Sequence, residues 1–173
     1  NVAGQPRSHV AMLTASGAVD GSFAPALGAD DSVFGLTLQP DGQLLVGGAF
    51  LSYEGVTENR IVRLNPDGSL DTSFGGNGKV TTDFGFYDYA YHMAIDDSGR
   101  IVVAGYIYNY AIGNVDFALA RYNDDGSLDT SFDGDGVATA NLGGTSTVHD
   151  VALQTDGKIV TGGAKEISYP RED

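Results

Sequence analysis

The sequence predicts an all-β fold made of four-stranded antiparallel units, because two interleaved phrases repeat along it. One phrase is a glycine turn followed by Leu or Val, Asp and Ser-Phe, and it occupies 16–23, 67–74 and 125–132. The other is a polar turn ending in Gly and followed by an apolar run, and it occupies 38–48, 95–105 and 153–163. The phrases return after about 58 residues in their later copies, and a period of a few tens of residues is typical of stacked repeat units.

Each unit contains two turns of the Asp-Gly type between apolar runs. This is a strong β-hairpin signal, because Gly and Asp tolerate the positive φ that such turns need. We expect four strands in each unit. Strand a is expected at 33–39, 91–96 and 148–154; strand b at 43–49, 100–107 and 158–164; strand c at 8–14, 60–65 and 116–122. Strand d is expected to start near 18–23, 69–74 and 127–132, with 79–84 and 137–142 continuing or completing it.

The apolar runs of strand b predict how the units stack. Leu44-Leu45-Val46 and Ile101-Val102-Val103 are continuous rather than alternating, which is typical of a sheet that is covered on both faces. Four-stranded sheets stacked radially as blades have this property, so we expect β-propeller blades. We find no long segment with a 3.6-residue apolar period and expect little helix.

The order of the phrases predicts one propeller segment over 1–173. It comprises a half blade at 1–32, blades at 33–89 and 90–147, and a half blade at 148–173. A closed propeller typically needs ~4–8 blades, so this is a partial propeller. Two explanations stay open: the segment belongs to a longer chain, or two copies assemble and each a–b half pairs with a c–d half of its partner.

The phrases also resemble a known family. The string Arg63-Leu64-Asn65-Pro66-Asp67-Gly68-Ser69-Leu70-Asp71-Thr72-Ser73-Phe74-Gly75 resembles the delta-60 repeat of bacterial surface and secreted proteins, as does the stretch 117–126. The resemblance extends from about Val10 to Gly163. It implies a propeller-like β fold and an extracellular or cell-surface location in bacteria, and it brings no general catalytic residue set. The first copy departs from the pattern, with Ser16 at the turn Asp and Gly21 at the usual Thr.

Composition narrows the classes of partner. The net charge is −14, with 23 acidic and 9 basic residues, which argues against nucleic acid and anionic lipid surfaces as partners, since both need clustered Lys and Arg. The chain has no cysteine, so disulfides, thiol nucleophiles and zinc–thiolate sites are excluded. No apolar stretch approaches the ~20 residues of a membrane span, and we expect no membrane insertion.

The Asp-Gly loops are the candidates for metal binding. Asp129, Asp133 and Asp135 lie close together in sequence and could offer oxygen ligands to calcium. The EF-hand pattern fails, however, since Leu142 stands where the loop's last ligand would be Glu. The alternative is that these aspartates shape turns through hydrogen bonds to backbone N–H groups. Because Asp71 and Asp129 recur at one position of the repeat, with Asp20 as their counterpart, we interpret them as structural acceptors. No other cofactor is expected.

No catalytic residues are predicted. His9, His92 and His149 do not form an HExxH motif, and His92 and His149 are one position out of step when the repeats are aligned. The sequence also contains no G-x-S-x-G motif.

Tyrosines depart most from the repeat. They cluster in the middle unit, where the aligned copies carry other residues, and those we predict to form a binding surface are Tyr87, Tyr89, Tyr106, Tyr108 and Tyr110. Aromatic rings with a polar tip suit protein contacts or stacking on sugars. The alternative is packing between blades or against a neighbouring chain.

The sequence therefore favours a non-catalytic binding or structural module of a larger bacterial surface or secreted protein. It would present propeller loops to a protein or glycan partner. The alternatives are the propeller domain of an extracellular hydrolase and an accessory subunit of a larger complex.

Overall fold

The computed structural model describes residues 9–25, 27–57, 60–81, 88–109, 114–141 and 145–166. In these ranges the chain forms β-strands and one 3₁₀ turn, η1 (Phe74–Gly76), and it contains no α-helix. No helix in the described ranges is long and apolar enough to cross a membrane. The chain divides into two compact units, the first comprising 1–81 with 125–127 and the second 82–124 with 128–173.

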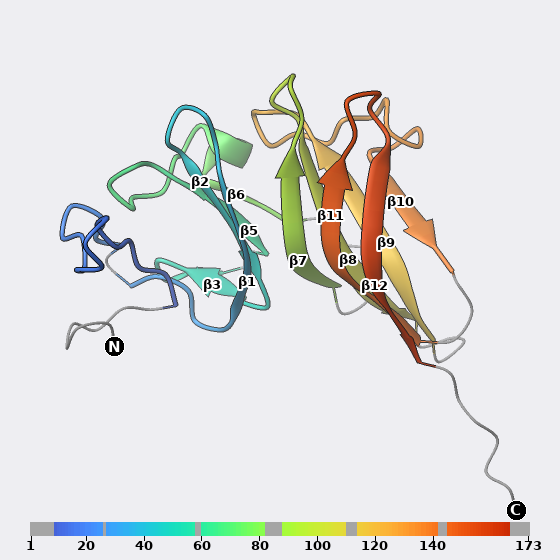
Figure 1. The fold of residues 1–173 in the computed structure, drawn as a ribbon, viewed down its shortest axis with the longest axis horizontal. Coiled ribbons are helices and arrows are strands. Elements are labelled where there is room, and N and C mark those ends of the chain that lie inside the picture. Colours follow the sequence, from blue (N-terminus) through green and yellow to red (C-terminus); the bar gives the residue numbers. More distant parts are fainter. Residues whose placement is uncertain are drawn as a thin grey trace, which may run out of the picture. The chain divides into compact units, whose positions relative to one another are not determined.

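The first unit contains one four-stranded antiparallel sheet (Figure 1). Its strands follow the chain order β1 (Val33–Leu38), β2 (Leu44–Gly48), β5 (Ile61–Leu64) and β6 (Lys79–Val80). A short hairpin of β3 (Ser52–Tyr53) and β4 (Val56–Thr57) lies in the connection between β2 and β5. Each strand of the four-stranded sheet pairs with the next strand of that sheet along the chain, which is the topology of a propeller blade.

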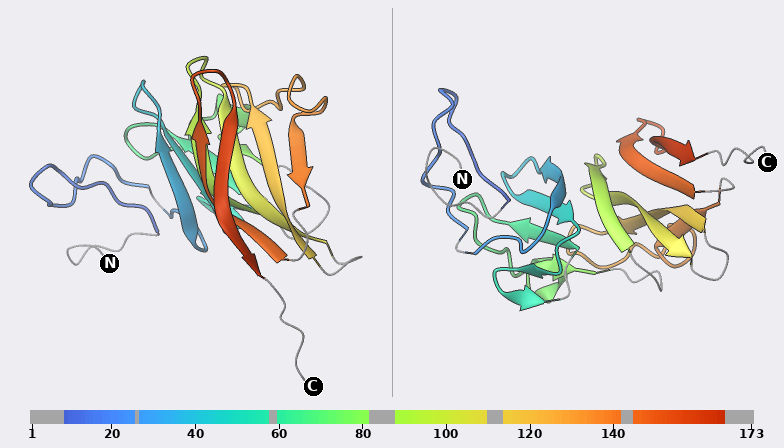
Figure 2. Two further views of the ribbon diagram at one scale, coloured as in Figure 1. Left: turned by 45° about the vertical axis from the view of Figure 1, so that its right-hand side comes forward. Right: turned by 90° about the horizontal axis from the view of Figure 1, so that it is seen from below.

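The second unit repeats this sheet and adds a hairpin (Figure 2). β7 (Asp88–Ile95), β8 (Ile101–Asn109), β9 (Asn114–Tyr122) and β10 (Val137–Ala140) form the second four-stranded sheet. β11 (Thr145–Leu153) and β12 (Ile159–Glu166) form a two-stranded sheet. The all-β fold with four-stranded propeller blades is therefore confirmed. Strands a, b and c of the two whole blades are β1, β2 and β5, then β7, β8 and β9.

The expected start of strand d was wrong. Residues 69–73 and 127–132 pair only through isolated bridges, Leu64 with Leu70 and Tyr122 with Leu128, and Phe74 begins η1. The fourth strands are β6 and β10, in the stretches that were expected to continue or complete strand d. The reason is local: the Asp71 carboxylate accepts a hydrogen bond from the N–H of Ser73 at 3.1 Å, which bends the chain into a turn. In the first copy, where strands were expected at 8–14 and 18–23, the described residues 9–14 and 18–23 contribute one bridge, between Leu13 and Val19.

Strand a carries a β-bulge at the same position in each copy. The register shifts between Val33 and Gly35, between Ala90 and His92, and between Val148 and Asp150. The extra residues are thus Phe34, Tyr91 and His149. His149 is the bulged residue, whereas His92 follows the bulge of its own strand, so the two histidines are not equivalent, as expected.

Each unit has its own core. In the first, Val10 and Phe23 pack with Val46, Val62 and Leu64 of the sheet. In the second, Val148 and Val151 of β11 pack with Val102 and Ala104 of β8. A sheet face is therefore covered in each unit by the adjacent repeat, by the segment 10–23 in one case and by β11 and β12 in the other. Burying apolar side chains in this way supplies the main favourable contribution to folding.

Each Asp-Gly turn between strand c and the Ser-Phe phrase contacts the preceding repeat. The N–H of Ala24, after Phe23, donates to the carbonyl of Asp67 at 3.0 Å, and the N–H of Gly75, after Phe74, donates to the carbonyl of Asp125 at 2.8 Å. Both contacts lie in the first unit, which includes 125–127. Gly68 has φ +88°, and a Cβ there would lie 2.9 Å from Cδ of Pro25. Glycine is required here both by the turn and by the close approach.

Gly68→Ala should therefore destabilise the first unit by about 3 kcal/mol, the sum of a left-handed alanine and an overpacked contact. Gly17→Ala is the matched control, because Gly17 has a similar φ of +83° and open space around its Cβ position. We expect it to cost about 1 kcal/mol. Urea unfolding followed by far-UV circular dichroism measures both. Equal losses for the two variants would show that the contact with the preceding repeat contributes nothing.

Candidate functional site

A buried ion pair closes the turn after strand c in the first unit. Arg63 Nε donates to Asp71 Oδ2 at 2.6 Å, and the Arg63 side chain is only 4% exposed. Asp71 Oδ1 accepts two further hydrogen bonds, from the N–H and the hydroxyl of Ser73 at 3.1 and 2.8 Å. The Arg63 guanidinium also lies 4.8 Å from the centre of the Phe74 ring. The carboxylate thus links strand c, the turn and a core aromatic ring.

The second unit contains the same arrangement. Arg121 Nε donates to Asp129 Oδ2 at 2.8 Å, and Asp129 Oδ1 accepts from the N–H and hydroxyl of Ser131 at 3.0 and 2.7 Å. The Arg121 guanidinium lies 4.8 Å from the centre of the Phe132 ring. Arg63 and Arg121 were not singled out in the sequence, although each precedes its aspartate by the same eight residues. A network present in two repeats is structural.

The first repeat keeps the turn but lacks the arginine. Asp20 accepts from the N–H and hydroxyl of Ser22 at 2.9 and 2.6 Å, as its counterparts do. The N–H of Asp20 donates to the carbonyl of Met12, just as the N–H of Asp71 donates to that of Arg63. Met12 therefore stands at the position of the arginine.

A residue from the turn between strands a and b also reaches this carboxylate. Gln43 Nε2 donates to Asp71 Oδ2 at 2.9 Å. At the equivalent position Arg100 lies 3.7 Å from Asp129 Oδ2, and its Nε donates to Asp96 at 2.6 Å. The third copy of the position is Lys158, which pairs with Asp156 of its own turn.

The electrostatics of these aspartates favour the ionised form. Burial acts to raise the pKa of Asp71, but the hydrogen bonds from Ser73 and Arg63 outweigh it and hold the pKa below its ordinary value. The hydroxyl of Ser131 is the largest cause of the lowered pKa of Asp129. Carboxylates of this kind accept hydrogen bonds at neutral pH, whereas a general acid needs a raised pKa.

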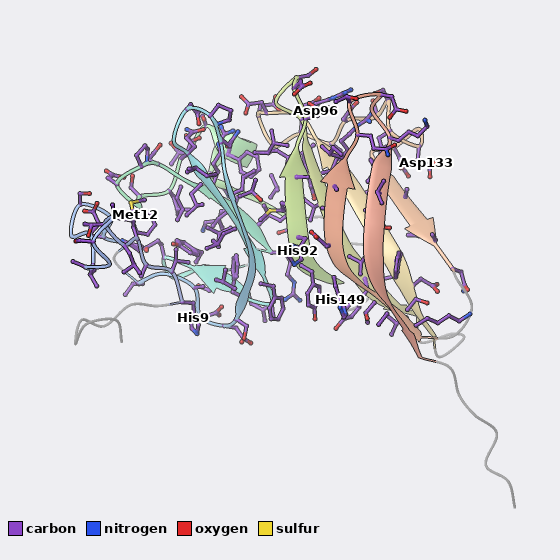
Figure 3. All side chains as sticks on the ribbon, viewed as in Figure 1. His9, Met12, His92, Asp96, Asp133 and His149 are labelled. Carbon is purple, nitrogen blue, oxygen red and sulfur yellow. The ribbon has the colours of Figure 1, made fainter. Side chains whose placement is uncertain are left out.

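The second unit has a groove between two of its turns. It has a volume of about 280 Å³ and is lined by the β7–β8 turn, with Asp96 and Arg100, and by the β11–β12 turn, with Gln154 and Thr155. Figure 3 shows Asp96 at the end of the unit opposite His92 and His149. The groove offers a guanidinium, an amide and a hydroxyl for hydrogen bonds with a polar ligand. Sequence reasoning missed it because its two walls are more than fifty residues apart in the chain.

The tyrosine cluster is described in part. Tyr106 stacks on Tyr91, with ring centres 5.3 Å apart and an interplanar angle of 29°, and the Tyr91 hydroxyl donates to that of Tyr106 at 3.3 Å. Burial, with the adjacent Tyr91, raises the pKa of Tyr106 to about 12. Tyr89 is the register partner of Tyr106, and Tyr108 lies on β8 opposite Val115. Tyr87 and Tyr110 lie outside the described residues.

Two histidines lie on the strands that carry the bulges. His92 follows Tyr91, and its Nδ1 lies 3.4 Å from Asp150 Oδ1. His149 Nε2 forms a hydrogen bond of 3.1 Å with the hydroxyl of Thr147. Tyr91 was absent from the predicted surface; the bulge that brings it next to Tyr106 is a feature of strand pairing and has no sequence signal of its own.

The candidate calcium ligands are engaged in separate roles. Asp129 accepts from Arg121 and Ser131, while Asp135 Oδ1 accepts the N–H of Val137 at 3.0 Å. Asp133 has a positive φ of 50° in the same loop. Within the described ranges, no group of three or more His, Asp or Glu side chains is placed to hold a metal ion.

Comparison with known proteins supports the propeller assignment. Residues 39–74 and 97–132 match a family described as a domain of unknown function (DUF5122) beta-propeller. Each matched segment begins near a turn between strands a and b and ends on the phenylalanine of the Ser-Phe phrase. No curated protein matches the sequence. The sheets and this match together define a β-propeller repeat protein.

Asp71→Ala should destabilise the first unit by about 3 kcal/mol, because it leaves the buried Arg63 guanidinium without its carboxylate. Asp20→Ala is the control: it removes the same two Ser hydrogen bonds from a turn that has Met12 in place of the arginine. We expect a distinctly smaller loss there. Urea unfolding measures both, and similar losses would show that the serine bonds rather than the ion pair stabilise the turn.

The lowered pKa of Asp71 also predicts acid sensitivity. A carboxyl whose pKa is lower in the folded state adds stability above its unfolded pKa of about 3.9, and this stability is lost as the pH falls through the folded pKa. The unfolding free energy should therefore fall between pH 5 and pH 2, and by less in Asp71→Asn than in the native sequence. Identical pH dependence in both proteins would contradict the assigned pKa direction.

Proposed function

We propose that this chain is a non-catalytic binding module, in which the repeated blades form a scaffold and side chains found in one blade contact a protein or glycan partner. The observation that carries the proposal is the Tyr91–Tyr106 stack. The aligned positions hold Phe34 and Ala49 in one copy and His149 and Ala164 in the other. The other repeats therefore form their strands without this stack, so the fold of a blade does not need it.

The chemistry of this surface suits a partner with flat apolar faces and hydroxyl or amide groups. Both tyrosine rings are half-buried, so they offer a fixed aromatic surface at little entropic cost. The His92 side chain is 43% exposed and that of Asp150 76% exposed, so both can form hydrogen bonds with a partner. Sugar rings and the side chains of a protein both meet this description.

The carboxyl groups support a non-catalytic function. Among the described residues, Asp71, Asp96 and Asp129 all have a lowered pKa and are held by cations and N–H groups of the scaffold. A lowered pKa accompanies structural ion pairs as well as active sites. For Asp71 and Asp129 the arginine and serine partners recur from one repeat to the next.

The setting we propose is a bacterial surface or secreted protein. It rests on the resemblance of the phrases at 63–75 and 117–126 to delta-60 repeats. The net charge of −14 fits a soluble surface exposed to solvent.

Tyr91→Ser with Tyr106→Ser should weaken partner binding and preserve the fold. We would use affinity electrophoresis through neutral and acidic soluble polysaccharides, together with tyrosine fluorescence, which is accessible because the chain has nine Tyr and no Trp. Retention by a neutral polysaccharide should fall about tenfold in the double variant, since two ring contacts are lost. The acidic polysaccharide should bind poorly because the protein is itself strongly acidic.

Two controls separate the possible causes. Tyr91→Phe with Tyr106→Phe keeps both rings and should retain binding if stacking dominates. Phe34→Ser with Ala49→Ser makes the equivalent change in the first unit and should leave binding unchanged. If the tyrosine-to-serine variant bound as tightly as the native protein, the tyrosine pair would be a packing contact. If no polysaccharide were retained, glycans would be excluded, and cross-linking to surface proteins would test the remaining partner class.

A further inference from the structure

Two parts of the described chain correspond to the two halves of one blade. Residues 10–23 form the c–d half: the Leu13–Val19 bridge corresponds to the Leu64–Leu70 bridge of the whole blade. β11 and β12 form the a–b half, with the same bulge as β1 and β2. In the described part of the chain β12 pairs with β11 alone, whereas its counterparts β2 and β8 each pair with a strand on both sides.

Apolar side chains on these halves are exposed where their counterparts are buried. Leu13 is 52% exposed, whereas the equivalent Leu64 of the first unit is fully buried. Val160 is 50% exposed, whereas the equivalent Val102 is 1% exposed beneath β11.

The neighbouring strand β1 shows the same difference. Leu36 is 54% exposed, whereas its counterpart Val151 is 8% exposed in the core of the second unit. Leu13, Val160 and Leu36 are therefore apolar residues at positions whose counterparts in another repeat are buried.

The charges of the two halves are complementary. Asp20 occupies the position at which Asp71 and Asp129 meet an arginine, but Met12 replaces that arginine. Lys158 occupies the position from which Gln43 and Arg100 reach this carboxylate in whole blades. A blade built from the two halves would bring the Lys158 ammonium to Asp20 and supply the positive charge that Met12 lacks.

We propose that two copies of this chain associate by completing each other's blades, with β12 of one copy pairing with residues 10–13 of the other. The registers of the whole blades place Val160 opposite Met12 and Thr161 opposite Ala11, as Val102 lies opposite Arg121 and Val103 opposite Ala120. Val160 then covers Leu36, and Lys158 meets Asp20.

A second copy fits because both halves lie on one chain. The contact is reciprocal, so each copy gives a β12 edge and receives one, which is the closed two-fold arrangement usual for dimers. Counted over the described residues, two whole blades and one shared blade from each copy make six blades, within the ~4–8 typical of propellers. The association is independent of the proposed function and uses other residues.

Charge reversal tests the proposal. Light scattering after gel filtration should give twice the mass of one chain. Asp20→Lys and Lys158→Asp should each weaken the dimer about tenfold, since two ion pairs become repulsive contacts. The double variant should recover to within about threefold of the native dissociation constant. Asp97→Lys, an exposed turn residue outside the proposed contact, carries the charge change of Asp20→Lys and should have little effect.

Mixing the two single variants tests whether a second copy, the same molecule or another protein pairs with β12. In a mixed dimer both shared blades regain opposite charges, so the mixture of Asp20→Lys with Lys158→Asp should dimerise more tightly than either alone. The protein could instead stay monomeric at all concentrations, with each single charge reversal lowering its stability and the double variant restoring it. That result would place the shared blade within one molecule and overturn the proposal. A monomer indifferent to all the reversals would overturn it as well, and would leave the exposed surfaces to another repeat or another protein.

The apolar contact gives a second test that does not depend on charge pairs. Val160→Asp and Leu36→Asp should each abolish dimerisation without loss of far-UV circular dichroism, because both side chains are exposed in the single chain. Leu51→Asp is the matched control, because Leu51 is 57% exposed and lies outside the proposed contact. If the control weakened the dimer as much as the other two, net charge rather than the shared blade would govern association.

Discussion

The carboxylate of the Ser-Phe phrase is the interaction on which the blades depend. In each whole blade it accepts hydrogen bonds from the serine two residues later and from an arginine eight residues earlier, and the arginine lies over the phenylalanine that follows the serine. One side chain thus fixes the turn, holds strand c and orients a core ring. Because the residue after the phenylalanine donates a hydrogen bond to the next repeat's turn, the same contact also sets how successive repeats meet.

This constraint explains which parts of the fold could be predicted from the sequence. Strands a, b and c follow from apolar runs between Asp-Gly turns, and β1, β2, β5, β7, β8 and β9 lie where those runs predict. Strand d was misplaced because the phrase at 69–74 combines apolar residues with an aspartate that binds the backbone of Ser73. The carboxylate competes with the strand ladder for that N–H group, and a pattern of apolar residues does not reveal such competition.

The candidate sites were predictable to a different degree. Tyr106 stood out because the aligned repeats carry alanine, but Tyr91 reaches it only through a bulge, and the bulge is a property of pairing between strands. The groove beside Arg100 needs two turns distant in sequence to lie together. By contrast, the recurring Arg63 and Arg121 were visible as a fixed spacing to Asp71 and Asp129. Residues that recur from repeat to repeat indicate the scaffold, whereas residues found in one repeat, such as Tyr106, indicate the surface that is particular to this chain.

The same distinction applies to Met12 and Lys158. A methionine at the arginine position would leave Asp20 without a cation if its blade were built like the others. Lys158 pairs with Asp156 of its own turn rather than with the aspartate of a Ser-Phe phrase. Considered separately, each is a defect of one repeat. Considered together, they place a positive charge on one half of a blade and its missing counterpart on the other, at positions joined in the whole blades by Gln43 with Asp71 and by Arg100 with Asp129. In the proposed dimer the two halves meet, Lys158 supplies a cation to Asp20, and the exposed Leu13, Leu36 and Val160 become buried in that same contact.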